Sequence, residues 1–65
     1  MKLMILSMEG DGIIEFRIDD KYQYRVAIDK IHYPYIRANW LRAPGKVINY
    51  IKKHGEIIYD NRQAT

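Results

Sequence analysis

Gly45 and Lys46 come closest to a motif with chemistry of its own, the phosphate-binding loop. That loop also requires a Gly five positions before Gly45 and a Ser or Thr after the Lys. Trp40 and Val47 occupy those two positions. We therefore interpret Pro44-Gly45 as the end of one helix and the start of the next. The free N–H groups at that helix start could still hold a single anion.

The other residue types with chemistry are sparse and dispersed. His32 and His54 stand far apart in the sequence, without the short spacing of metal-ligand pairs, which predicts surface or helix-end roles for both. Ser7 lacks the flanking glycines of a nucleophile elbow. The Asp residues of the first half fall in turns, and the chain has no Cys. These observations predict a protein that is not an enzyme and holds no metal or cofactor.

Aromatic residues are more numerous than a small core can cover. The chain has six Tyr, one Trp and one Phe among 65 residues, so some rings are expected at the surface, where Tyr is well suited to recognition. The alternative is that Tyr rings shield a thin core and keep their hydroxyls in water. The leading patch is Tyr33-Pro34-Tyr35, followed by Arg37.

Basic residues gather in the second half. Residues 32–65 carry six Lys or Arg against two Asp or Glu, whereas residues 1–31 carry five against six. Such a face can dock an acidic protein, can track a nucleic-acid backbone while Tyr rings stack on bases, or can simply be a solvated surface. The candidate binding residues are Tyr33, Tyr35, Arg37, Arg42, Lys46, Tyr50, Lys52 and Lys53.

Alternating and helical periods place these residues on a fold. The predicted elements are strands over 2–8, 14–18 and 22–28, a helix after Pro34, a second helix from Pro44 to a terminating Gly55, a short strand over 56–59 and a frayed tail over 61–65. This order predicts one small two-layer α+β domain over residues 1–65. Its antiparallel sheet of three to four strands starts as a meander and packs on two short C-terminal helices, although the helix pair is also compatible with a helix-turn-helix.

The pattern also predicts which residues are buried. The first strand is apolar on both faces, which is typical of a strand covered on both sides. Its surplus apolar surface and the open sheet edges predict a homodimer. The expected core residues are Phe16, Ile18, Tyr24, Val26, Ile36, Trp40, Ile48 and Ile51.

No apolar run is long enough for a signal peptide or a membrane span. We therefore expect a cytoplasmic protein with no membrane partner. Ile, Lys, Asn and Tyr, whose codons are rich in A and T, make up 26 of the 65 residues. This bias and the short length favour a virus or mobile element as the source, which would place the protein in the host cytoplasm.

The segment 13–59 resembles the KTSC domain, a small module of bacteria and phages. The residues that carry the resemblance are Ile14-Glu15-Phe16-Arg17-Ile18, Tyr22-Gln23-Tyr24, Ala43-Pro44-Gly45-Lys46 and Asn49-Tyr50-Ile51-Lys52. The resemblance implies an α+β fold and a non-enzymatic role at RNA or on a protein partner. It implies no particular site residues.

Two functional hypotheses follow. The first is a small protein-binding module that contacts a host protein or a copy of itself through a Tyr-rich patch and a basic helix face. The second is a protein that binds RNA or single-stranded DNA through its basic half.

Overall fold

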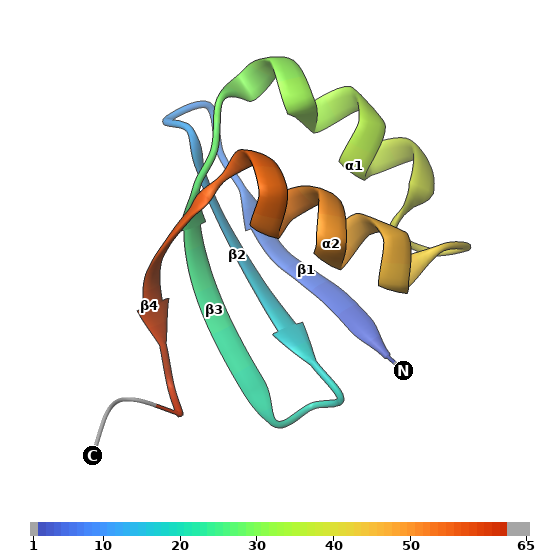
Figure 1. The fold of residues 1–65 in the computed structure, drawn as a ribbon, viewed down its shortest axis with the longest axis vertical. Helices are drawn as coiled ribbons and strands as arrows, with labels where there is room; N and C mark the ends of the chain where they lie inside the picture. Colours follow the sequence, from blue (N-terminus) through green and yellow to red (C-terminus); the bar gives the residue numbers. More distant parts are fainter. Residues whose placement is uncertain (1, 63–65) are drawn as a thin grey trace.

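Four strands form one antiparallel sheet, and two helices cover one of its faces in the computed structural model (Figure 1). The structure describes residues 2–62. The elements are β1 (Leu3–Met8), β2 (Ile13–Ile18), β3 (Tyr22–Ala27), the 3-10 turn η1 (Lys30–His32), α1 (Tyr33–Asn39), α2 (Pro44–His54) and β4 (Glu56–Asp60). The predicted α+β class and two-layer arrangement are confirmed.

The strand order β1-β2-β3-β4 continues the predicted meander, with the fourth strand added beside β3. Three residues, Asp19, Asp20 and Lys21, join β2 to β3, and Asp19 and Asp20 have positive φ angles of 55° and 56°. Positive φ at both positions defines the type I′ turn, whose twist matches that of the strands it joins. The Lys21 N–H donates to the Ile18 carbonyl at 3.1 Å and closes the hairpin. The polar turn that the sequence predicts therefore fixes the β2–β3 register.

The core lies between the sheet and the helices. Seven of the eight predicted core residues are buried, but Trp40 is only half-buried and packs against the edge of the core. Trp40 lies in the turn after α1, beside Leu3 at the edge of the sheet. The buried apolar residues are Leu3, Ile14, Phe16, Ile18, Tyr24, Val26, Ile28, Tyr33, Ile36, Val47, Ile48 and Ile51.

β1 differs from the expectation of a strand covered on both sides. It lies at one edge of the sheet, and the helices cover only the face that carries Leu3. Met4 and Leu6 are 40% and 39% exposed. The apolar run therefore leaves uncovered hydrophobic surface along β1.

The spacing of Ile36, Trp40 and Ala43 predicts a first helix that runs up to Pro44, but α1 is shorter. It begins at Tyr33 and ends at Asn39, because Pro44 opens α2 and the intervening residues form the turn between the two helices. Before it, the Asp29 carboxylate accepts from the Ile31 N–H and caps η1. Among residues 2–62, neither helix has the length and apolar content needed to cross a membrane.

An ion pair between Asp60 and Arg62 holds the end of β4. Arg62 falls in the predicted frayed tail, and this pair was not predicted from the sequence. Asp60 is buried, and its carboxylate accepts from the Arg62 side chain at 3.0 Å and from the Arg62 backbone N–H at 3.0 Å. Asn61 donates through its backbone N–H to the Gln23 carbonyl at 3.1 Å. Residues 61 and 62 are thus tied to the sheet, while 63–65 lie outside the described residues.

We expect this ion pair to make stability depend on pH on the acid side. The hydrogen bonds from Arg62 lower the pKa of Asp60 below its ordinary value of 3.8. A lowered pKa in the folded state gives a stabilisation that is complete above the unfolded-state pKa and is lost as the pH falls below about 4. The urea concentration at the unfolding midpoint of the wild type should therefore decrease as the pH is lowered below about 4.

The Asp60→Asn variant should lose most of this acid dependence and should already be less stable at neutral pH, because it removes the charge that Arg62 binds. Asp20→Asn is the matched control, since Asp20 pairs with Lys2 at 3.0 Å while both side chains are more than half exposed. An acid profile that is the same in wild type and Asp60→Asn would contradict the assignment.

Candidate binding surface

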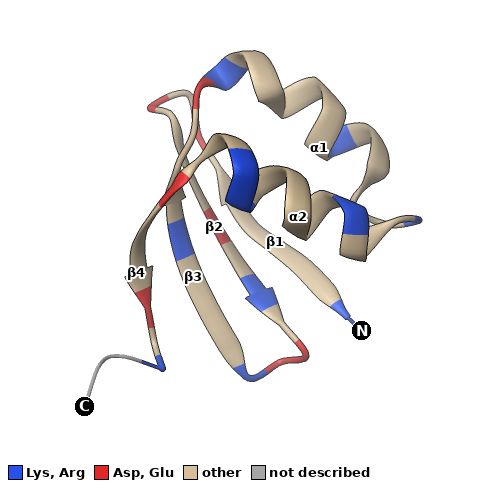
Figure 2. Ribbon diagram, viewed as in Figure 1, with Lys and Arg blue, Asp and Glu red and all other residues tan. Residues whose placement is uncertain are grey.

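The acidic residues are absent from one of the two layers of the fold. We call residues 30–55 the helical layer; it carries six Lys or Arg and no Asp or Glu, while all eight acidic residues lie in the rest of the chain. Figure 2 shows basic positions on both helices and acidic positions on the strands and turns. All six cations are exposed, and neither ion pair found among residues 2–62 involves them. The charges of the helical layer are therefore all positive and all exposed.

Four aromatic rings from three elements stack on one another in this layer. We call His32, Tyr35, Tyr50 and His54 the ring cluster. The Tyr35 and Tyr50 rings stack with centroids 4.1 Å apart, and the His32 and His54 rings stack at 4.5 Å. The Tyr50 hydroxyl lies 2.6 Å from Nδ1 of His32. These contacts fix α2 against η1 and α1.

The contact between the two His residues was not predicted from the sequence. They are far apart along the chain, and only the antiparallel packing of α2 against η1 brings their rings together. Each is expected to be a surface residue, and His54 is exposed while His32 is half-buried. Within residues 2–62, no group of three or more His, Cys, Asp or Glu side chains comes together as metal ligands would.

Tyr33 does not belong to the exposed patch that the sequence suggests. It is 6% exposed, and its hydroxyl donates to the Glu9 carbonyl at 2.7 Å. Burial raises the pKa of Tyr33 above its ordinary value of 10.0, and the nearby Asp11 carboxylate raises it further. Tyr33 therefore anchors the start of α1 to the β1–β2 turn, and of this Tyr pair only Tyr35 is exposed.

The three Lys residues of α2 divide between two sides of the helix. Lys46 and Lys53 are seven residues apart, which is close to two full turns, so they project along one line with Tyr50 between them. Lys52 is turned by about 100° from Lys53. It approaches β4 instead, where its charge helps to lower the pKa of Asp60. Lys46, Tyr50 and Lys53 thus form the part of the predicted site that adjoins the ring cluster.

The two predicted Arg residues lie on and after α1. Arg37 is exposed in the last turn of that helix. Arg42 follows the helix in the exposed turn, where its guanidinium donates to Asn39 at 3.4 Å. They extend the positive charge over α1 without joining the ring cluster.

Two large apolar side chains are exposed within the same positive layer. Ile31 is 76% exposed and Leu41 is 79% exposed, the highest values among the large hydrophobic residues described. Ile31 lies in η1 and Leu41 in the turn after α1, so neither belongs to the apolar stripe of a helix. A surface with cations, stacked rings and exposed apolar side chains can contact a partner that is both acidic and apolar.

No protein-family model, curated protein or solved structure matches this chain. The similarity to the KTSC domain rests on the motifs of the sequence and stays a prediction.

Proposed function

We propose that this chain is a small non-enzymatic binding module that docks on the acidic surface of a partner protein through its helical layer. The observation that carries the proposal is the separation of charge: six exposed cations and no acidic residue in the layer that also holds the ring cluster. Charge of one sign on one face speeds encounter with a partner of the opposite sign and orients it.

The exposed apolar residues favour a protein partner over nucleic acid. Protein interfaces bury an apolar centre inside a polar rim, and Ile31 and Leu41 supply exposed apolar surface among the cations. Proteins that bind single strands stack bases on free ring faces. Here the Tyr35 ring is stacked on Tyr50, and Tyr50 also contacts His54, so much of their ring surface is already covered.

A viral or mobile-element source and a role in the host cytoplasm belong to the same proposal. They rest on the abundance of Ile, Lys, Asn and Tyr, amino acids whose codons are rich in A and T. The KTSC resemblance supports it as well, since it implies a non-enzymatic role on a protein partner or at RNA.

Charge reversal on one side of α2 tests the proposal. Lys46→Glu combined with Lys53→Glu should weaken binding to a labelled peptide of alternating Glu and Leu by roughly tenfold, measured by fluorescence anisotropy. Both side chains are exposed, so the helical circular dichroism should not change. The matched control is Lys21→Glu with Arg25→Glu, which changes the net charge equally but on the sheet side, and it should bind almost as the wild type does.

The competing function has a distinct result in the same assay. If labelled single-stranded RNA or DNA binds more tightly than the peptide, and its affinity falls steeply with salt, then the helical layer serves nucleic acid instead. Capture of a protein from a nuclease-treated cell lysate by wild type and control, but not by the α2 variant, would support the protein interface. Equal binding by both double variants would contradict any role for the charge of the helical layer.

A further inference from the structure

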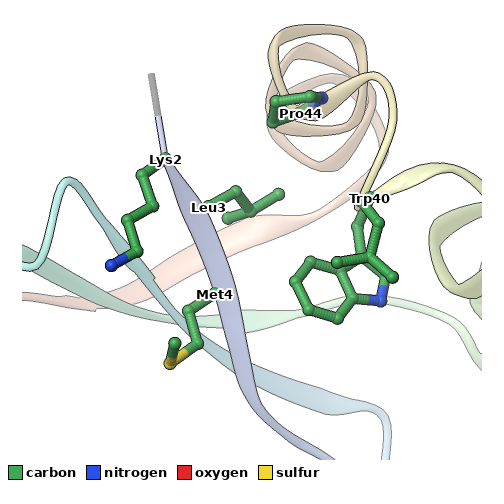
Figure 3. A pocket seen from close by; sticks show the side chains of 6 residues that line it. Lys2, Leu3, Met4, Trp40 and Pro44 are labelled. Carbon is green, nitrogen blue, oxygen red and sulfur yellow. The ribbon is translucent and has the colours of Figure 1, made fainter.

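An apolar pocket of about 340 Å³ opens beside the free edge of β1. Figure 3 shows that Leu3 extends toward Trp40 and Pro44, while Lys2 and Met4 extend to the other side of the strand. The pocket is lined by Lys2, Leu3, Met4, Trp40, Leu41 and Pro44. It therefore lies between the N-terminal half of β1 and the turn that joins the two helices.

The edge of β1 next to this pocket is itself suited to pairing. β1 is the first strand in the sheet order, so one side of its backbone has no neighbouring strand within the described chain. Unpaired N–H and C=O groups along an apolar edge are a template for a further strand. Met4 and Leu6 add exposed apolar surface along the same strand.

We propose that a second copy of this chain occupies this edge, with the two β1 strands antiparallel about a two-fold axis. The sheet then continues from one copy into the other. Closed two-fold dimers of this kind present the same surface from each copy and leave no further β1 edge open.

The bulge in β1 gives the register of this pairing. Leu3 lies opposite Ile18 and Met8 lies opposite Ile14, and both partners face the helices, because the β1–β2 register shifts between Ile5 and Ser7. An antiparallel pairing centred between Ile5 and Leu6 then places Leu3 opposite Met8 of the second copy. Residues that face the helices thus meet on the same side of the joined sheet, although they are an odd number of positions apart in sequence.

This register also matches the chemistry of the pocket and its surroundings. Met8 of the second copy comes beside Leu3 at the pocket, and the flexible Met side chain fills irregular apolar space. Lys2, whose ammonium lies 3.0 Å from the Asp20 carboxylate of its own copy, comes opposite Glu9 of the second copy, so each end of the paired strands brings a cation beside a further anion. The Glu9 carboxylate makes no ion pair within residues 2–62 and is exposed.

The first experiment uses the absence of native Cys. Leu6→Cys puts a thiol close to the two-fold axis, so mild oxidation should convert most of this variant to a disulfide-linked dimer. Ile58→Cys is the matched control, because Ile58 is similarly exposed on β4 at the opposite edge of the sheet and should stay largely monomeric. Equal trapping of the two variants, or preferential trapping of Ile58→Cys, would overturn the proposal.

The second experiment tests the register by exchanging charges. Lys2→Glu and Glu9→Lys should each weaken self-association in sedimentation velocity, because each variant places like charges opposite one another. An equimolar mixture should recover it, since both cross-strand pairs in the mixed dimer are then of opposite charge. Circular dichroism shows whether each variant is folded. A mixture no more associated than its components, or a wild type that is monomeric at high-micromolar concentration, would rule the proposed dimer out, whatever the helical layer binds.

Discussion

Phe16→Ala should lower the melting temperature by about 12 °C or more. Phe16 is 1% exposed at the centre of the core, and its ring stacks on Tyr24 with centroids 5.2 Å apart. Removing a buried Phe side chain costs about 3–5 kcal/mol, since it loses the transfer free energy and leaves a cavity. A domain of this length has a total stability of only about 3–10 kcal/mol.

Thermal melting followed by circular dichroism would measure this loss. Leu41→Ala is the matched control, because it also removes a large apolar side chain but from a position that is 79% exposed. Its melting temperature should stay within a few degrees of the wild type, as expected for surface changes below about 0.5 kcal/mol. A Phe16→Ala protein that melts like the Leu41→Ala control would show that the sheet and helices do not pack as described.

The strands and the two-layer fold were predictable because their signals are local. Alternation along β2 and β3 shows directly which side chains face the core, and the polar residues between them mark the turn. The α2 stripe of Val47, Ile48 and Ile51 is equally legible, and all three residues are buried. The spacing of apolar residues was enough to predict an element wherever one of its faces packs on the core and the other is exposed to water.

The features that the sequence did not predict depend on contacts between distant segments. Tyr33 is buried because its ring packs in the core and its hydroxyl reaches the Glu9 carbonyl, 24 positions away in the chain. The His32–His54 stack requires α2 to return antiparallel beside η1. β1 is an edge strand because β4 pairs with β3 and not with β1. The periodicity within β1 does not show which of these two strands β4 will pair with.

The sequence shows the positive charge of the second half, but dividing the chain into residues 1–31 and 32–65 hides the absence of acidic residues from the helical layer. A split into halves groups Glu56 and Asp60 of β4 with the helices and Lys30 with the strands. The structure draws the boundary at residues 30 and 55, and within it no acidic residue remains. The candidate surface was therefore predictable in its sign and only partly in its members, since Tyr33 leaves it and His32 joins it.

Gly55 ends α2 as the sequence predicts, but for a different physical reason. The sequence places a terminating Gly there, for which the usual reason is a left-handed backbone after the helix. Gly55 does end α2, but its φ is −112°, an extended conformation open to any residue. What excludes a side chain is close packing, because an added Cβ would lie 2.6 Å from Cγ1 of Val26 and 2.9 Å from the Ile51 carbonyl oxygen.

Gly55→Ala should therefore destabilise the fold by about 1–3 kcal/mol or more, as overpacking does in tightly packed regions. The Val26 side chain can shift, but the carbonyl oxygens of Ile51 and Ala27, the latter at 3.0 Å, belong to the backbone of α2 and β3. The same substitution at Gly45 is the matched control, because no heavy atom lies within 4 Å of a Cβ there. Gly45→Ala should be neutral or stabilising by up to about 1 kcal/mol, since Ala favours the helical backbone. Urea unfolding of the two variants should thus move the midpoint in opposite directions, and a Gly55→Ala midpoint at or above that of the wild type would show that the end of α2 does not approach β3 this closely.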